Sequence, residues 1–112
     1  MSKAVVNSSV IIALSNLGYL NKLKPLIGEI FVAKAVYQEI CFAGQGLIGA
    51  NELEEEVKNH NIEVKDAKNQ LLVTALLEPL GLGEAETIAL AIDEHANLIV
   101  LDDMQPEEKP KL

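Results

Sequence analysis

The segment from residue 81 to residue 103, GLGEAETIALAIDEHANLIVLDD, constrains the fold more than any other part of the chain. Its first half carries apolar residues at the spacing of one helix face, namely Ala85, Ile88, Ala89 and Ile92. Residues 97–101 then form a short apolar run, which predicts a buried strand. A helix that leads directly into a buried strand is typical of α/β proteins.

Two carboxylates, Asp102 and Asp103, directly follow the apolar run. Open α/β sheets bind their ligands outside the carboxyl ends of parallel strands, so these residues are expected at a ligand-binding edge. Considered alone, a catalytic role and an ordinary polar strand end explain the two residues about equally well.

The rest of the chain continues the alternation of strands and helices. Strands are predicted at residues 3–7, 30–32 and 62–64, and helices at residues 10–17, 19–26, 34–42, 52–59 and 70–77. Ser8 or Ser9 is expected to cap the first helix and Gly18 to end it, while Asn51 caps the helix at residues 52–59. This order implies right-handed crossovers and a small parallel sheet flanked by helices, which is the α/β class.

The composition predicts one domain at residues 1–103 and a tail at residues 104–112. A content of 49% hydrophobic and 23% charged residues is ordinary for a globular domain. The tail, MQPEEKPKL, holds two prolines and little apolar content, so we expect it to be disordered. No apolar run reaches the roughly 18 residues of a membrane span. The first residues do not form a secretory signal, so a cytoplasmic protein without membrane contact is expected.

The net charge of −8 is distributed unevenly along the chain. Residues 1–50 hold four lysines and two acids, whereas residues 51–112 hold five lysines and fifteen acids. Every basic residue is lysine, so no arginine offers a bidentate contact to phosphate. This balance argues against a broad phosphate-binding surface, and any contact with nucleic acid must be local or assisted by a metal ion.

Two further acids, Glu39 and Glu84, are candidates for a shared site. Glu39 flanks the apolar stripe of the helix predicted at residues 34–42. Glu84 stands four residues before Ile88 and shares its side of the helix, whereas Glu86 lies about 160–200° away around the helix axis. Glu84 is therefore the better candidate of the two, although a first-turn acid is equally well explained by the helix dipole.

Convergence of Glu39, Glu84, Asp102 and Asp103 would create a cluster of oxygen donors without histidine or cysteine. Such donors suit Mg²⁺ or Mn²⁺, which bind through a few carboxylates, water and substrate phosphates. The ion would offset the acidic charge and would generate or orient a water molecule for phosphodiester cleavage.

Four segments of the chain together resemble the PIN-domain nucleases, a family that includes the toxin ribonucleases of toxin–antitoxin pairs. The segments are VVNSSVIIALSNLG, VAKAVYQEI, GLGEAETIALA and LIVLDD, and the resemblance covers nearly all of residues 1–103. It implies a small parallel sheet between helices, and acids that hold Mg²⁺ or Mn²⁺ for the cleavage of single-stranded RNA. By position, Glu39, Glu84 and Asp102 match the acidic ligands and Asp103 is a candidate additional ligand. An antitoxin-like protein is the partner that this resemblance implies.

The chain departs from the family pattern at three places. Asn7 stands where the family usually has its first aspartate, so it can offer a carbonyl oxygen but no negative charge, and metal affinity should fall. Ala33 stands where a proline is common. The family continues past its fourth acid into another helix and a last strand, which this chain is expected to lack. The resulting open sheet edge predicts a homodimer or larger homo-oligomer.

Two functions from different classes remain open at this point. The first is a metal-dependent ribonuclease that acts through Asn7, Glu39, Glu84 and Asp102, toxin-like if the resemblance extends to that role. The second is a degenerate, catalytically weak PIN-like module with a binding or assembly role. The retained acids favour the nuclease, and Asn7 with the short C-terminal region favours the module.

Overall fold

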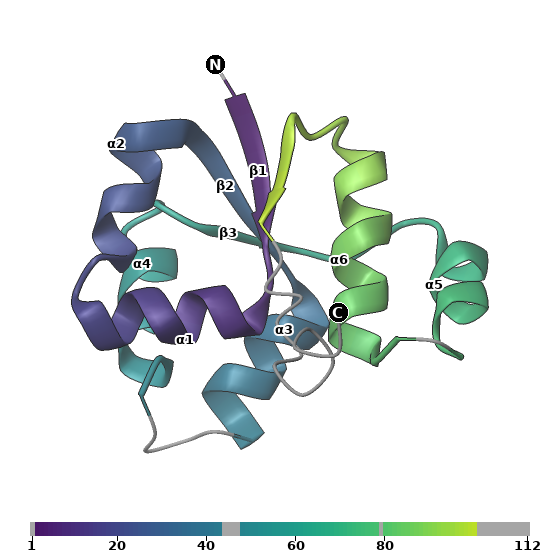
Figure 1. Cartoon of the computed structure of the whole chain (residues 1–112), viewed down its shortest axis with the longest axis horizontal. Coiled ribbons are helices and arrows are strands. Elements are labelled where there is room, and N and C mark those ends of the chain that lie inside the picture. The colour runs from purple at the N-terminus through teal and green to yellow at the C-terminus, as the bar shows by residue number, and fades with distance from the viewer. Residues whose placement is uncertain (1, 44–47, 79, 101–112) are drawn as a thin grey trace, which may run out of the picture.

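A four-stranded parallel sheet forms the centre of the protein (Figure 1). The computed structural model describes residues 2–43, 48–78 and 80–100. The strands are β1 (Ser2–Val6), β2 (Gly28–Ala33), β3 (Glu63–Lys65) and β4 (Leu98–Val100). Their order is β3-β2-β1-β4, so β1 is central and β4 lies at an edge of the sheet within the described residues. The predicted α/β class and the parallel sheet are confirmed.

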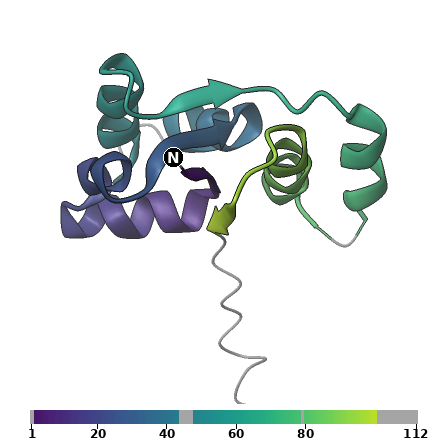
Figure 2. The same ribbon diagram turned by 90° about the horizontal axis from the view of Figure 1, so that it is seen from above.

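Helices cover both faces of this sheet. They are α1 (Ser8–Leu17), the 3₁₀ helix η1 (Leu20–Lys22), α2 (Leu23–Ile27), α3 (Lys34–Gln38), the π-helix η2 (Glu39–Ala43), α4 (Ala50–Lys58), α5 (Gln70–Leu76) and α6 (Leu82–Asp93). Figures 1 and 2 show α1, α2 and α4 on one side and α6 on the other, with α5 outside α6. Within the described residues, no helix is long and apolar enough to cross a membrane.

The core is built on strand β1, which is buried on both faces. Ala4, Val5 and Val6 have no exposed surface, as expected for a central strand of a parallel sheet with helices on each side. Ile11 of α1 and Leu53 of α4 are equally buried and belong to the same apolar cluster. The run of small branched residues in β1 therefore fixes the middle of the sheet, and with it the position of the residue that follows.

Two predicted helix caps are wrong, although the end of α1 is correct. Asn7, and neither Ser8 nor Ser9, caps α1, because its Oδ1 accepts a hydrogen bond from the Val10 amide at 3.3 Å. Gly18 ends α1 in the left-handed region at φ 77°, which glycine adopts without steric cost.

The cap of α4 lies earlier than predicted. Gly49, and not Asn51, is the N-cap residue, and its amide donates to Glu52 Oε1 at 3.0 Å. The glutamate side chain thus satisfies the amide of the N-cap residue, which is one half of a capping box. The acidic run of this helix, ELEEEVK, is typical of a solvated face, and Glu52, Glu54 and Glu55 are indeed exposed, but Glu56 is only 8% exposed.

Residues on more than one side of helix α6 are buried, whereas the sequence predicted a single apolar stripe. Ala85 and Ala89 are fully buried as expected, but Ile92 is 58% exposed and Leu90 is fully buried. The reason is that α6 packs against β1, β2 and β4 on one side and against α3 and α5 elsewhere. A helix with several neighbours has no single apolar face, so the four-residue stripe was only half correct.

Glu94 joins three segments of the fold just beyond the end of α6. Its Oε2 lies 3.0 Å from Lys65 Nζ of β3, and its Oε1 lies 3.8 Å from Lys3 Nζ of β1. Lys65 Nζ also lies 5.1 Å from the centre of the Phe31 ring of β2. The hydrogen bond from Lys65 lowers the pKa of Glu94 below its ordinary value, since it favours the charged carboxylate.

We expect Glu94→Gln to lower the free energy of unfolding by about 1 kcal/mol at neutral pH, because a partly exposed ion pair contributes little more. A carboxyl whose pKa is lowered by folding stabilises the protein above its unfolded pKa, and this contribution is lost as the pH falls through the folded pKa. The difference in the free energy of unfolding between wild type and variant should therefore disappear as the pH falls from about 5 to about 2. Urea unfolding across this range measures it. Glu78→Gln, at an exposed position, is the control and should leave the free energy of unfolding close to that of the wild type.

Candidate active site

The carboxyl edge of the sheet brings together the elements that carry the predicted site residues. Val6 at the end of β1 pairs with Val100 at the end of β4, so Asn7 follows β1 beside the point where the chain leaves β4. In Figure 1 these two strands end at the same side of the sheet, where α1 and α3 begin and where α6 starts. Asp102 and Asp103 follow β4 in the sequence and lie outside the described residues.

Asn7 is held firmly in place at this edge. It is 3% exposed, its Oδ1 accepts from the Val10 amide, and its backbone oxygen accepts from the Ile11 amide at 3.2 Å. Its side chain therefore serves as the N-cap of α1. As an amide, this side chain carries no charge. An aspartate could make the same cap, because both residues are favoured at this position.

Glu39 occupies the first position of the π-helix that follows α3. Short π-helical turns often occur at functional sites, because the extra residue redirects the side chains around it. The Glu39 side chain is exposed to solvent, whereas Val36 and Ile40, which form the apolar stripe of the same helical segment, are buried.

The Glu39 carboxylate lies against the start of α6. A Cβ atom on Gly83 would approach Glu39 Oε1 to 3.1 Å, which is closer than ordinary contact, so the missing side chain of Gly83 makes room for the carboxylate. Glu84 is the next residue and lies half-buried in the first turn of α6. The structure therefore brings the segments of Glu39 and Glu84 together, although they are far apart in the sequence.

Glu86, which the helical period placed on another side of the helix from Glu84, makes a contact that the sequence did not predict. Its Oε1 accepts a hydrogen bond from the Ala35 amide in the first turn of α3, at 3.0 Å. Ala33, the N-cap residue of α3, has no side chain that could accept this bond, so a carboxylate from α6 supplies the acceptor. Glu86 is thus a positioning residue for the helical segment that carries Glu39. The only sequence signal for this role of Glu86 was Ala33: an alanine at the N-cap position leaves the first amides of α3 without a side-chain acceptor.

The chemistry of the donor set fits a hard divalent cation. Asn7 offers an amide oxygen, and Glu39 and Glu84 offer carboxylates, which are the ligand types that Mg²⁺ and Mn²⁺ prefer. Within residues 2–43, 48–78 and 80–100, no group of three or more His, Cys, Asp or Glu side chains could hold a metal ion. Asp102, the further acid that the sequence offers as a candidate ligand, lies outside these ranges.

A second feature of α3 was not predicted from the sequence. A hollow of about 380 Å³ lies between α3 and the end of β3, and we call it the aromatic hollow; it is lined by Lys34, Tyr37, Gln38, Phe42, Val64, Lys65 and Asp66. The Tyr37 and Phe42 rings meet edge to face with centroids 6.1 Å apart. Phe42 is 65% exposed, which is unusual for a large aromatic side chain. Burial raises the pKa of Tyr37, so its phenol stays neutral at physiological pH.

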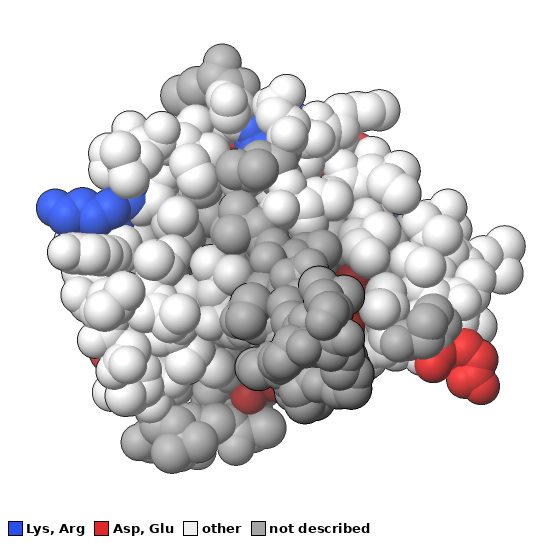
Figure 3. Space-filling view, viewed as in Figure 1, with Lys and Arg blue, Asp and Glu red and all other residues white. Residues whose placement is uncertain are grey.

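The charge on the visible surface agrees with the sequence. Figure 3 shows the face that carries α1 and β4, and lysine atoms are sparse among the described residues on it. A broad cationic surface is therefore not present on the described part of this face. Contacts with a polyanion would have to be local there, as the composition predicted.

Comparison with known proteins gives one match. A family model described as a PIN domain matches residues 3–109. No curated protein and no solved structure matches the chain. The matched range includes all candidate ligands, which are Asn7, Glu39, Glu84, Asp102 and Asp103. The domain boundary expected at residue 103 stays a prediction.

Proposed function

The chain belongs to the PIN-domain family, and from this premise we propose that it is a metal-dependent ribonuclease that cleaves single-stranded RNA. A PIN domain indicates a nuclease-type function, and PIN domains are generally dependent on divalent metal ions. The observation that carries the proposal is the position of the Glu39 carboxylate beside Gly83, the residue directly before Glu84: a Cβ atom on Gly83 would lie 3.1 Å from Glu39 Oε1. A toxin-like role, an antitoxin-like partner and a cytoplasmic location stay predictions from the sequence.

In this proposal Glu39, Glu84 and Asp102 hold the ion together with the amide oxygen of Asn7, and Asp103 is an additional candidate ligand. When bound, Mg²⁺ or Mn²⁺ supplies an activated or oriented water and compensates charge at the phosphate. Asn7 anchors its oxygen through the α1 cap, and Glu86 keeps the start of α3 in place. The two carboxylates near the start of α6 repel phosphate unless a cation lies between them, which makes cleavage depend on the metal ion.

The aromatic hollow supports single-stranded RNA as the substrate class. Unpaired bases can stack on exposed aromatic rings, whereas bases inside a duplex cannot. Phe42 offers an exposed ring, the half-buried Tyr37 ring packs edge to face with it, and the exposed Lys34 offers one phosphate contact. The amine of Lys65 is already bound to Glu94, so it is not counted as a phosphate ligand.

A cleavage assay with a labelled single-stranded RNA oligonucleotide tests the proposal. We expect slow cleavage with Mn²⁺ or Mg²⁺, none with a chelator, and weaker cleavage of the same sequence as a duplex. Cleavage that persists in the chelator would contradict the metal-dependent mechanism. Absence of cleavage by a protein shown to bind Mn²⁺ would favour the second candidate described below.

We expect Asn7→Asp to tighten Mn²⁺ binding by about tenfold, because affinity rises with the number of charged ligands. The α1 cap should survive, since aspartate caps as well as asparagine. Asn69→Asp is a matched control: Asn69 caps α5 by accepting from the Leu72 amide at 3.0 Å, so the same chemical change is made at another helix start. Calorimetric titration compares the three proteins. If neither the wild type nor Asn7→Asp binds the ion, the shared site does not exist.

The second candidate is a binding or assembly module without turnover. Two observations favour it: the neutral amide of Asn7 replaces a charged ligand, and β4 lies at an edge of the sheet within the described residues. An open edge can pair with a strand of another chain. This candidate predicts a homodimer or larger assembly at micromolar concentration. A clean monomer in sedimentation experiments would contradict it.

A further inference from the structure

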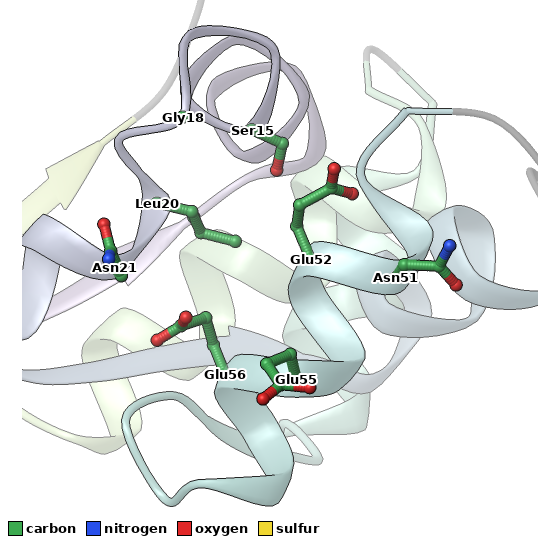
Figure 4. Close-up of a pocket in the computed structure, with 8 residues that line it drawn as sticks. All are labelled: Ser15, Gly18, Leu20, Asn21, Asn51, Glu52, Glu55 and Glu56. Atoms are coloured by element: carbon green, nitrogen blue, oxygen red, sulfur yellow. The ribbon is translucent and has the colours of Figure 1, made fainter.

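A pocket of about 350 Å³ lies between the C-terminal part of α1, η1 and α4 (Figure 4). It sits at the opposite end of α1 from Asn7, so it shares no residue with the candidate active site. Ser15 lies in the last turn of α1 and Gly18 is the C-cap residue, and this end of a helix carries partial negative charge. No basic residue in that turn offsets this charge.

One side chain in this pocket has an unmet hydrogen-bonding requirement. Ser15 is only 7% exposed, and its Oγ is buried without a hydrogen-bond partner among the described residues. Figure 4 shows its hydroxyl directed from α1 into the pocket, toward the Glu52 side chain of α4. Buried polar groups in folded proteins nearly always have a partner, so this hydroxyl indicates an occupant with a donor or acceptor group.

Three carboxylates from one face of α4 make the pocket strongly anionic: Glu52, Glu55 and Glu56. Glu56 is 8% exposed, and Asn61 Nδ2 donates to its Oε1 at 2.9 Å, while Glu52 Oε1 accepts from the Gly49 amide. Each of these two carboxylates keeps a second oxygen that is free of such bonds in the described structure. The ion pairs of the described residues all involve Glu94, so they do not neutralise this cluster.

The arrangement suits an extended organic cation better than a metal ion. The described carboxylates do not form a group of three that could hold a metal ion. A guanidinium is planar and presents five N–H donors, so it can bond to carboxylates and a hydroxyl that do not converge on one point. Leu20 points toward the middle of the pocket and provides an apolar wall for an alkyl stem.

We propose that this pocket binds an alkylguanidinium cation. The guanidinium donates to the free oxygens of Glu52 and Glu56 and to Ser15 Oγ, and the alkyl stem packs on Leu20. The chain contains no arginine, so the cation comes from another molecule, either a small guanidine or an arginine side chain of a polypeptide. The proposal does not depend on the nuclease function.

Titration of the full chain with propylguanidinium, followed by NMR, tests the proposal. We expect saturable shifts at Ser15, Leu20 and Glu56, and binding at least about tenfold tighter than that of the neutral propylurea, as charged hydrogen bonds allow. A capped tripeptide with arginine between two glycines distinguishes the sources: tighter binding of the peptide identifies a polypeptide arginine, and tighter binding of propylguanidinium identifies a small guanidine.

Matched variants make the test specific. Glu52→Gln and Glu56→Gln keep the oxygen that caps Gly49 or bonds Asn61 but remove the charge, so each should weaken binding by about tenfold with the fold intact. Glu54→Gln lies on the same helix, is exposed and does not line the pocket, so it should bind as wild type does. Lack of saturable binding by both cationic probes would overturn the proposal. Equal binding of propylurea, or an equal loss in Glu54→Gln, would overturn it as well.

Discussion

Replacement of Glu39 by glutamine is expected to reduce metal-dependent cleavage of single-stranded RNA by about 100-fold or more. A metal ion contributes several kcal/mol to such a transition state, and about 1.4 kcal/mol corresponds to a factor of ten in rate. Stability should change little, because the Glu39 side chain is exposed. Glu29→Gln is the control: Glu29 is an exposed acid near the amino end of β2, away from the carboxyl edge. Equal activities of the two variants would contradict the assigned role of Glu39.

The roles of Glu84 and Glu86 in α6 can be separated in the same assay. Glu84→Gln should lose activity as Glu39→Gln does, because a charged ligand is removed. Glu86→Gln keeps an acceptor for the Ala35 amide and should stay near normal, whereas Glu86→Ala leaves this amide without its partner and should lower activity through α3. A full loss in Glu86→Gln would show that its charge, and not its hydrogen bond, is what the site requires.

Leu90→Ala is expected to lower the free energy of unfolding by about 2–5 kcal/mol, the usual cost of a cavity in a packed core. Leu90 is fully buried in the cluster that joins α6 to the sheet. Ile92→Ala, two residues further along α6, should cost less than about 1 kcal/mol, because Ile92 is 58% exposed. Denaturant unfolding of both variants measures the difference. A larger loss at Ile92 would support the face predicted by periodicity against the structure.

Leu90 and Ile92 illustrate which parts of the fold could be predicted from the sequence. The uninterrupted apolar run of β1 and the left-handed Gly18 are local signals, so the central strand and the end of α1 were predictable. The buried surface of α6 was not, because it depends on contacts with α3 and α5 that join distant parts of the chain. Simple periodicity assumes one buried face and therefore misplaced Leu90 and Ile92.

Some features of the candidate site could likewise be predicted from the sequence, and others could not. Parallel strands end at one edge, so the ends of the first and last predicted strands were expected at the same edge of the sheet, but the direct pairing of β1 with β4 was not predicted. The role of Glu86 did not, because its partner is a backbone amide 51 positions away in the sequence. The α1–α4 pocket was also missed, since it depends on Ser15 facing a helix that had been interpreted as a solvated acidic face.

The most direct test of the central claim is an NMR titration of the full chain with Mn²⁺, which broadens the signals of nuclei near the bound ion. The proposed site predicts that the backbone amides of Asn7, Glu39, Glu84 and Asp102 broaden first and together. Asn7→Asp should produce the same pattern at a lower Mn²⁺ concentration. Broadening centred on α4, whose acidic residues Glu52, Glu55 and Glu56 offer the competing carboxylates, would contradict a metal site at the carboxyl edge of the sheet.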